Sequence, residues 1–515
     1  MEEISDWLRL ADKFADDGNA EGMLGAAQEI LALDKNSADG YAVLAEADLY
    51  LGNLDAAENF APENLRGRLV KAAVASEKFE LITALKSFAE VIDEARAAGD
   101  KKILSKALAW SANSLYLAGD AKTAAENLRE ASALTGSAEL FSKHLFLSNY
   151  NGGAAKSVAQ EYDKFFAGVE QFAQESYSHE KIRVGYISPD FRQHAVANFV
   201  APLLNDFDSE NFSVSVYQTG ASDFVTARLK SGKVHWRDLQ SFDAETVARI
   251  IHADEIDILV DLSGHTQNSC LPVLAYKPAP VQICAIGYTA TTGLSAVDYV
   301  LSDTNCAADE NNFTEKILRV EGCRLCYAPF AEIPAAAHVQ NSRVTFGSFN
   351  NFAKVTDEIL EVWREILNAV PNSRLVIKSK ICSISDGREI VMRRLKNFPR
   401  ESVELRPYSR DYLEQYNEIE VALDTFPYNG GVTTCEALFM GVPVVTLRGG
   451  LGASILSAAG LTEFVARDSG EYIEKAVELA RQGNLNLREK VLASRLMDGR
   501  KYMQALEKIY MEISN

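Results

Sequence analysis

Short runs of β-branched apolar residues, separated by stretches with helical spacing, fill most of the chain beyond residue 180. Such runs are typical of strands buried on both faces, which occur in parallel sheets covered by helices. The first series comprises Arg183–Ser188, Val214–Tyr217, Asp257–Leu262, Val281–Ala285 and Tyr299–Ser302. The second comprises Val344–Phe349, Arg374–Ile377, Val403–Leu405, Val421–Asp424 and Val442–Leu447. The pattern predicts two doubly wound, Rossmann-like α/β domains joined at a break near residues 330–341.

A repeat precedes the strands. Its period of 34 residues is that of tetratricopeptide (TPR) units, in which a small residue lets two helices pack and a glycine opens the turn between them. The pairs that show it are Ala11 with Ala45 and Gly18 with Gly52. A later unit fits around Ala112 and Gly119, whereas residues 65–104 are helical in pattern but out of register. A plain antiparallel bundle is the alternative, and either one predicts an arm for packing or interaction without a catalytic group.

We therefore predict three parts: a TPR-like helical domain over residues 1–177, a first Rossmann-like catalytic domain over 178–335, and a second over 336–515. The second ends in amphipathic helices between Leu487 and Ile513. Ligands of such folds bind beyond the carboxyl ends of the strands. The loops that directly follow strands are therefore the places to look for chemistry.

The loop after the fourth strand of the second series has a phosphate-binding pattern. Gly430 and Gly431 make a turn that exposes backbone N–H groups, and a helix begins near Thr433. The free N–H groups and the dipole of a helix N-terminus suit a diphosphate. Thr433 and Thr434 add hydroxyl donors, and Glu436 can accept from a ribose. Thr433-x-x-Glu436 is also a plain capping box, and both interpretations stay open.

Three more strand-end residues are candidates. Lys354, with Asn351 before it, could place a compact positive charge on a phosphate. The alternative for this lysine is an ordinary solvated side chain. His194 and His265 follow two strands of the first series, and histidine is the usual acid or base near neutral pH. The alternative for each is a histidine satisfied by local hydrogen bonds.

Composition excludes several classes of protein. The net charge of −20 argues against a nucleic-acid partner. The start of the chain is acidic, unlike a secretory signal, and no apolar stretch reaches the ~18 residues that a membrane helix needs. We therefore expect a cytoplasmic protein without a membrane span. The seven cysteines predict no disulfide framework, and we expect no metal at Asp206-x-Asp208 or at Cys323-x-x-Cys326.

Several segments, taken in order, resemble one family. They are Arg183–Phe191 with His194, Leu259–Thr266, Lys277–Gln282, Ile286–Leu294 with Val297–Tyr299, Phe349–Lys354 and Leu423–Gly431. They are similar to the catalytic domains of the O-linked N-acetylglucosamine (O-GlcNAc) transferases, most of all the SPINDLY-like and bacterial branch. The resemblance covers about residues 181–480, and the repeat arm in kind.

The resemblance implies a GT-B fold with the nucleotide-sugar between the two domains. It implies no cofactor and no metal, inversion at the sugar carbon, a Ser or Thr acceptor on a protein, and UDP-N-acetylglucosamine (UDP-GlcNAc) as the donor. The matching positions are His194 for base or positioning work, Lys354 and Asn351 at the departing diphosphate, Thr433 at the pyrophosphate, Glu436 at the ribose and Tyr412 near the base.

The chain also departs from the family. Val432 replaces a threonine, Arg192-Gln193 replaces a smaller pair, and the segment Leu447–Ser454 is several residues short on the donor side. Three alternatives follow: a protein O-fucosyltransferase using GDP-fucose, another GT-B enzyme such as a nucleotide-sugar epimerase or glycan-chain transferase, and a TPR scaffold with a decayed core. The repeat arm favours a polypeptide partner, and the retained site residues argue against decay.

Overall fold

The computed structural model describes residues 3–174, 177–230, 233–306, 309–330, 333–337, 339, 341–483, 485 and 487–514. The chain forms two compact units. The first comprises residues 1–144 and 381–394, and the second comprises residues 145–380 and 395–515. Residues 331, 332, 338 and 340 of the expected break lie outside the described residues. No helix in the described part of the chain is long and apolar enough to cross a membrane.

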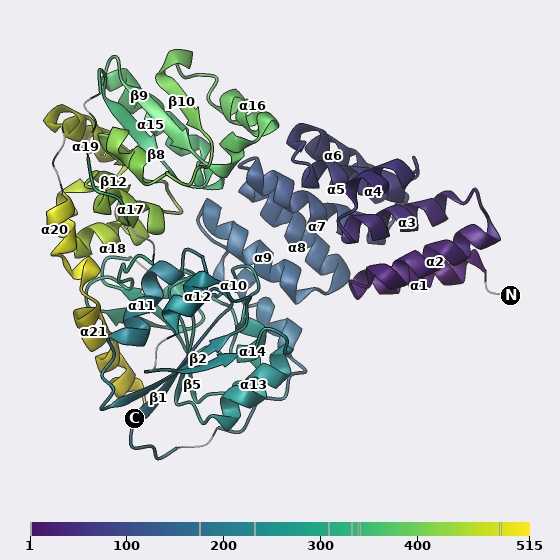
Figure 1. Ribbon diagram of the computed structural model, residues 1–515, viewed down its shortest axis with the longest axis horizontal. Helices are drawn as coiled ribbons and strands as arrows, with labels where there is room; N and C mark the ends of the chain where they lie inside the picture. The colour runs from purple at the N-terminus through teal and green to yellow at the C-terminus, as the bar shows by residue number, and fades with distance from the viewer. Residues whose placement is uncertain are drawn as a thin grey trace. The chain divides into compact units, whose positions relative to one another are not determined.

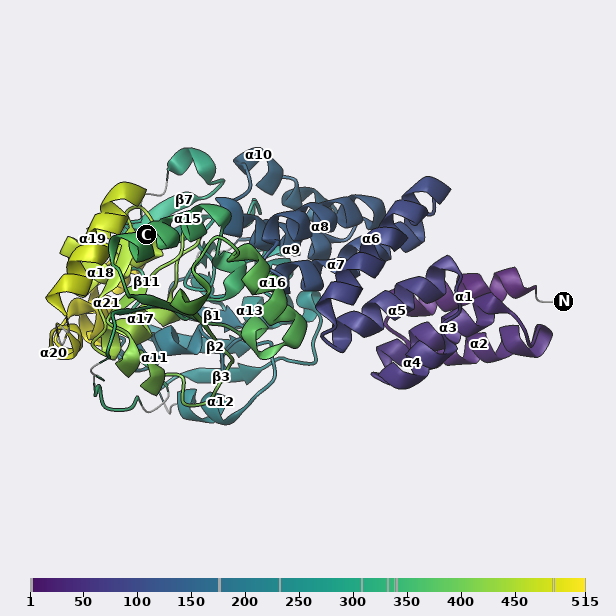
Figure 2. The ribbon, with the colours of Figure 1, turned by 90° about the horizontal axis from the view of Figure 1, so that it is seen from above.

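The first unit is a stack of antiparallel helices, drawn in purple to blue in Figures 1 and 2. Its helices are α1 (Ile4–Asp16), α2 (Ala20–Leu33), α3 (Ala38–Tyr50), α4 (Leu54–Phe60), α5 (Leu65–Glu77), α6 (Leu81–Ala98), α7 (Lys101–Leu117), α8 (Ala121–Thr135) and the start of α9 (Ala138–Ser148). A further helix, α16 (Ser385–Arg394), packs on α6, where the Asp386 side chain accepts the N–H of Ile82 at 3.1 Å.

The turns of this stack explain why part of the repeat was hard to recognise. Gly18, Gly52 and Gly119 close helical pairs with positive φ, as glycine does at low cost. Phe79 takes the same left-handed conformation between α5 and α6, at φ 59°. Helix α4 has only 7 residues, whereas α6 has 18. A short helix followed by a long one shifts the register of residues 65–104, although the helical pairing continues.

Charged side chains are buried between the odd-numbered helices of the arm. Glu46 of α3 is 1% exposed and pairs with Arg66 of α5 (Nε–Oε2 2.6 Å) and Lys106 of α7 (Nζ–Oε1 2.5 Å). Asp12 of α1 pairs with Arg66 (3.0 Å) and with Lys102 (2.9 Å). These ion pairs link four helices that are adjacent in the stack.

The second unit contains two parallel sheets. The first has the order β3-β2-β1-β4-β5-β6-β7 and the second β10-β9-β8-β11-β12-β13, with all neighbours parallel. The first sheet comprises β1 (Ile182–Ser188), β2 (Phe212–Gln218), β3 (His235–Asp238), β4 (Ile258–Asp261), β5 (Val281–Cys284), β6 (Tyr299–Asp303) and β7 (Lys316–Val320). The second comprises β8 (Thr345–Ser348), β9 (Arg374–Lys378), β10 (Val403–Arg406), β11 (Val421–Leu423), β12 (Val444–Leu447) and β13 (Val465–Ala466).

Helices connect and cover these strands (Figure 1). Those that accompany the first sheet are α10 (Lys156–Ala159), α11 (Ala197–Asn205), α12 (Phe224–Leu229), α13 (Ala244–Ala253) and α14 (Leu271–Ala275). The later helices are α15 (Asp357–Ala369), α17 (Val432–Phe439), α18 (Leu451–Ala458), α19 (Ser469–Gln482), α20 (Arg488–Leu492) and α21 (Gly499–Ile513). The predicted architecture, a helical repeat region followed by two Rossmann-like domains, is confirmed.

The C-terminal helix α21 returns to the first sheet, although it lies in the range predicted for the second domain. It packs against α11 and β7. The hydroxyl groups of Tyr186 in β1 and Tyr510 in α21 lie 3.3 Å apart, and Glu507 accepts the N–H of Asp208 at 2.6 Å. The turn before β2 that carries the second acidic residue of Asp206-x-Asp208 is thus held by this helix.

Candidate functional site

All four candidate loops follow the central strands of the two sheets. In the first sheet β1 and β4 are neighbours, and in the second β8 and β11 are. From β1 and from β8, the next two strands are added on one side of the sheet. The chain then crosses back, and β4 and β11 begin the strands on the other side. Ligands of doubly wound folds bind at such a topological switch point, beyond the carboxyl ends of the strands. The topology therefore directs attention to the loops that the sequence singled out.

Asp424 organises the loop after β11. Its carboxylate is buried and accepts the N–H of Gly430 (2.7 Å), the side-chain amide of Asn429 (3.0 Å) and the hydroxyl of Thr446 (2.7 Å). Burial raises the pKa of Asp424 to about 6, and these hydrogen bonds and the nearby Lys354 oppose the rise. The residue ties the loop from β11 to the end of β12, a role that its sequence position did not reveal.

The turn Gly430–Gly431 leads directly into α17. Gly431 is the N-cap residue of this helix, and no side chain caps it, so the capping-box interpretation of Thr433 and Glu436 is wrong. Thr433 donates to the Oδ1 of Asn350 at 2.9 Å, and Thr434 donates to the carbonyl of Gly430 at 3.0 Å. A helix N-terminus without a capping side chain keeps its N–H groups available to an anion.

Gly430 is required where it stands. A Cβ there would lie 2.5 Å from the Oγ1 of Thr433 and 2.9 Å from the Oδ1 of Asn350. Any larger residue would therefore disturb the hydrogen bond between these two side chains. Asn350 comes from the loop after β8, so this contact joins the two loops at the switch point of the second sheet.

Lys354 lies at the end of the turn Phe352–Lys354 after β8. Its ammonium donates to the carbonyl of Asn429 at 2.8 Å and lies 4.8 Å from the ring centre of Tyr428. Burial lowers the pKa of Lys354 to about 8, and Asp424 opposes the fall. The ring of Tyr150 stacks on the ring of Tyr428, with 4.8 Å between the ring centres. The lysine is thus a fixed cation beside the loop that precedes α17, and Asn351 is the exposed residue that caps its turn.

Glu436 lies one turn into α17 and is only 6% exposed. The hydroxyl of Tyr412 donates to its Oε1. Burial raises the pKa of Glu436 to about 7, and the hydrogen bond from Tyr412 opposes the rise. Tyr412 is the one side-chain donor to Glu436 among the described residues, so the buried carboxylate can accept further hydrogen bonds from a ligand.

His194 follows β1, in a turn that also carries Asp190. The Nδ1 of His194 lies 3.4 Å from the Oδ2 of Asp190, and the N–H of Val196 approaches the same nitrogen at 3.4 Å. Burial lowers the pKa of His194 and raises the pKa of Asp190. The lowered pKa favours a neutral imidazole at pH 7, which is the form that can take up a proton. No hydrogen bond or ion pair between described residues joins His194 to the α17 site.

His265 has a different environment. It is 1% exposed, its Nε2 lies 2.8 Å from the carbonyl of Thr292, and its ring packs edge-on against Tyr162 and Tyr288. This surrounding matches the alternative of a histidine satisfied by local hydrogen bonds. The neighbouring Asp261 is likewise engaged, because it accepts the N–H groups of Ser263 (3.0 Å) and Gly264 (2.6 Å).

The short segment after β12 brings α18 close to the same loop. A Cβ at Gly450 would lie 1.8 Å from the Oδ1 of Asn429, and one at Gly452 would lie 2.4 Å from the Oδ2 of Asp424. The two glycines therefore allow the first turn of α18 to pack on the Asp424 loop. Further along the helix, Ser454 donates to Asp303 at the end of β6. The segment thus links the two sheets of the second unit.

The second-domain predictions converge. Lys354 lies on the loop after β8, whereas Gly430, Thr433, Thr434 and Glu436 lie on the loop after β11 and in α17. The hydrogen bonds Thr433–Asn350 and Lys354–Asn429 join the two segments. Asn350 was expected only as one of two amides at the end of β8, and the roles of Asp424 and Asn429 were not predicted. Their signal was present, because each is a polar residue beside a strand end and next to a residue that had been singled out.

A family model matches residues 166–321 and 335–506, well over half of the chain, and its description is glycosyl transferase family 41. The chain belongs to glycosyl transferase family 41. The matched range begins before β1 and extends into α21, so family 41 accounts for both sheets and for the returning C-terminal helix.

Curated relatives of the chain include the probable UDP-N-acetylglucosamine–peptide N-acetylglucosaminyltransferase SPINDLY of Solanum lycopersicum. It is 40% identical over 357 residues, which are 64% of this chain and 38% of that protein. SPINDLY of Arabidopsis thaliana is 39% identical over 357 residues, or 64% of this chain and 39% of that protein. The chain thus spans somewhat over a third of the length of the curated relatives that it matches.

Among solved structures, a mutant of the Thermobaculum terrenum O-GlcNAc transferase is similar over 99% of this chain and 97% of that one. The TM-score is 0.76 at 26% identity. The similarity covers the helical arm as well as both sheets, and supports the GT-B arrangement that the sequence resemblance implied.

Proposed function

We propose that this chain is an inverting protein O-glycosyltransferase, which transfers N-acetylglucosamine from UDP-GlcNAc to a Ser or Thr hydroxyl of a polypeptide. The observation that carries the proposal is that Lys354 binds the carbonyl of Asn429, in the loop that leads into the uncapped N-terminus of α17, at the switch point of the second sheet. The ammonium of Lys354 and the positive end of the α17 dipole together suit a diphosphate. The names of the family 41 relatives, which are peptide N-acetylglucosaminyltransferases, support a sugar donor and a peptide acceptor.

The donor would bind with its diphosphate at the start of α17. The N–H groups there, the hydroxyl groups of Thr433 and Thr434, and the ammonium of Lys354 then face the phosphate oxygens. Glu436 would accept a ribose hydroxyl, and the ring of Tyr412 would lie near the base. Glycine at 430 and 431 leaves the backbone open to such an approach.

The reaction would be a single in-line displacement. The acceptor oxygen forms a bond to the anomeric carbon as the bond from that carbon to the diphosphate oxygen breaks, and the acceptor proton leaves to a base. Negative charge then grows on the leaving diphosphate. Donors fixed beforehand at that position are usually the largest catalytic contribution. We propose that Lys354 and the N-terminus of α17 supply the positive charge that stabilises the leaving diphosphate, so the reaction needs no metal cofactor.

We assign His194 to the acceptor side. Its neutral form can accept the acceptor proton, and Asp190 beside Nδ1 would stabilise the imidazolium that results. The helical arm would hold the polypeptide, because stacked helical repeats offer an extended surface for a partner. His265 would act only by supporting the loop after β4.

The test is thermal stabilisation of the full chain by UDP, GDP, UDP-GlcNAc and GDP-fucose. A ligand that binds the native state raises its melting temperature by mass action. We expect a shift with the uridine nucleotides that is lost in Lys354→Ala and retained in Lys396→Ala, an exposed lysine in the same domain. A shift with the guanosine pair alone would instead support fucosyl transfer. The absence of any shift at millimolar ligand would refute the proposal and favour the scaffold with a decayed core.

A further inference from the structure

The segment 407–417, between β10 and β11, carries two tyrosines to α17. Tyr412 donates its hydroxyl to Glu436, and Tyr416 donates its hydroxyl to the carbonyl of Thr433 at 3.2 Å. The ring of Tyr416 also packs on Phe349, with 4.3 Å between ring centres. We call this segment the tyrosine loop. Through Tyr412 and Tyr416, the tyrosine loop is thus attached at two points to the helix that we propose binds the nucleotide.

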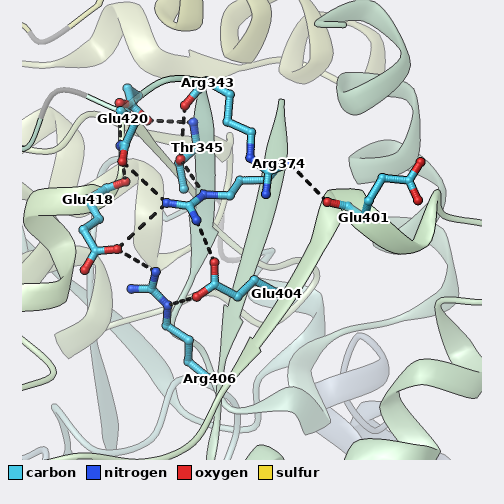
Figure 3. A network of polar contacts seen from close by, with 9 residues as sticks. Arg343, Thr345, Arg374, Glu401, Glu404, Arg406, Glu418 and Glu420 are labelled. Atoms are coloured by element: carbon cyan, nitrogen blue, oxygen red, sulfur yellow. Dashed lines mark hydrogen bonds and ion pairs between the residues drawn. The ribbon is translucent and has the colours of Figure 1, made fainter. Parts of the chain in front are cut away.

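A cluster of charges holds the base of the tyrosine loop (Figure 3). Arg406, just before the loop, donates from Nη2 to the Oε2 of Glu418, just after it, at 2.7 Å. Glu404 accepts from the Nε of Arg406 (2.7 Å) and from the Nη1 of Arg374 (2.8 Å). We call Arg374, Glu404, Arg406 and Glu418 the loop clamp. Cations and carboxylates alternate in it, so each charge has an opposite neighbour.

Lys378 adds a further attachment. This buried lysine ends β9 and donates to the carbonyl of Pro407 at 2.6 Å and to the hydroxyl of Ser409 at 2.8 Å. Gln415 donates to the same hydroxyl at 2.9 Å. Lys378 thus holds the start of the tyrosine loop, and the loop clamp holds its two ends together. Tyr412 and Tyr416 attach the loop to α17.

Glu436 has one carboxylate oxygen engaged. Tyr412 binds Oε1, whereas Oε2 accepts no hydrogen bond from any described residue. The other titratable groups beside Glu436 are Tyr327, Tyr416 and Cys435. Burial raises the pKa of each of these three, so they are neutral near pH 7. No ion pair reaches Glu436 in the described part of the chain, and the donor that favours its ionised form is Tyr412.

We propose that Tyr412 is a positioning residue for the ribose of the nucleotide. Its hydroxyl fixes the carboxylate of Glu436 so that Oε2 is left to accept a ribose hydroxyl, and the loop clamp sets the position of Tyr412. This inference rests on the proposed function, because it needs a nucleotide at α17.

The proposal has a consequence for pH. A hydrogen bond to the ionised form of a carboxyl group favours that form. A ribose hydroxyl in turn donates better to a carboxylate than to a carboxylic acid. Affinity for a ribonucleotide therefore falls as Glu436 takes up a proton. Loss of the Tyr412 hydroxyl moves this fall to higher pH, because the protonated form is then favoured.

The experiment measures affinity by calorimetry between pH 6 and 8.5. The ligands are UDP, GDP and their 2′,3′-dideoxy counterparts, and the proteins are the wild type, Tyr412→Phe and Tyr416→Phe. Tyr416 is the matched control, since it lies on the same loop and loses a hydroxyl that contacts a carbonyl. We expect Tyr412→Phe alone to raise the pH midpoint and to weaken the ribonucleotide about tenfold at pH 7. The dideoxy ligands should not respond.

Two results would overturn the proposal. One is a pH midpoint in Tyr412→Phe equal to that of the wild type, and the other is an equal loss with the dideoxy ligands. The loop clamp has its own test, a double-mutant cycle. Arg406→Met should weaken ribonucleotide binding in the wild type but add little to Tyr412→Phe, and additive effects would reject the assignment of the clamp.

Failure of the proposed function can be distinguished from failure of the role of Tyr412. If no nucleotide binds to any of these proteins, the proposed function is wrong, and Tyr412 can still be tested without ligand. The pH dependence of the melting temperature then reports the ionisation of Glu436. Identical curves for the wild type and Tyr412→Phe would overturn the action of Tyr412 on Glu436, and a difference absent from Tyr416→Phe would support it.

Discussion

Lys354 and Asp424, at the proposed diphosphate site, show how burial changes the ionisation of single residues. The two side chains influence each other across the loop after β11, and burial shifts the pKa of each toward neutrality, to about 8 for the lysine and about 6 for the aspartate. Near pH 7 the lysine is therefore charged but poorly solvated. A bound diphosphate would replace the water contacts that burial removes from the ammonium of Lys354.

Binding of a nucleoside diphosphate should weaken above pH 8. Lys354 loses its proton as the pH rises through about 8, so the attraction to the phosphates is present below that pH and lost above it. Calorimetry at pH 7 and pH 9.5 should show a loss of about tenfold. Lys354→Met should bind weakly at both values and show no such change. A wild-type affinity equal at the two values would refute this role for the lysine.

The ionisation of Glu436 should make the stability of the protein depend on pH between about 4.5 and 7. Its folded pKa of about 7 lies above the usual value of 4.5, so the folded state holds the proton more tightly. The resulting stabilisation is present below pH 4.5 and lost as the pH rises to about 7. The shift corresponds to about 3 kcal/mol. Urea unfolding at pH 5 and pH 8 should show that Glu436→Gln lacks this part of the change, and parallel pH responses of the two proteins would contradict it.

Among the elements, the central strands were predictable, whereas three of the four edge strands in the described sheets were not. All ten predicted strands are present, and most of them are short, largely apolar runs that are buried in the structure. The sequence analysis missed β3, β7 and β13. β3 has Trp236 as its one large apolar residue, β7 carries Lys316 and Arg319 among its apolar residues, and β13 has only two residues. Such strands lie at or near sheet edges, where one side meets solvent and the apolar signal weakens.

The candidate site was predictable in part, for a related reason. Positions directly after buried strands could be selected as candidates, since topology alone brings them to one edge of the sheet. Partners within a loop could not be inferred. The sequence could not show that Glu436 faces Tyr412 instead of capping α17, or that His265 is enclosed by two tyrosines. These contacts depend on side-chain packing between segments far apart in the chain.

The turn between α5 and α6 should be strained. Phe79 is exposed and has φ 59°, a conformation that costs an ordinary residue about 1 kcal/mol relative to glycine. Phe79→Gly should therefore stabilise the arm by about 1 kcal/mol, measured as an increase in the urea midpoint. Gly52→Ala is the matched control, because the equivalent turn there has φ 77° with open space around it and should lose stability. Equal effects of the two changes would contradict the strain.

At the scale of the molecule, the repeat arm depends on contacts between neighbours. Stacked repeats are stabilised by each helical pair and by its interface with the next. Glu46 lies at such an interface, because it joins α3 to Arg66 of α5 and to Lys106 of α7. Asp12 extends the same network to α1. A single buried carboxylate thus connects successive repeats.

Glu46→Gln should loosen the arm out of proportion to its size. The change keeps the shape but leaves Lys106 without its carboxylate partner and Arg66 with Asp12 alone, and breaking a buried pair in this way costs about 3 kcal/mol. Hydrogen exchange in the full chain should rise in α1 to α4. Glu94→Gln provides the control, since its pair with Arg68 is about half exposed and such pairs contribute little. If both variants exchange alike, the arm is held by its apolar contacts and the ion pairs serve only to satisfy one another. If only Glu46→Gln opens, the charges between repeats hold the successive helical pairs of the arm together.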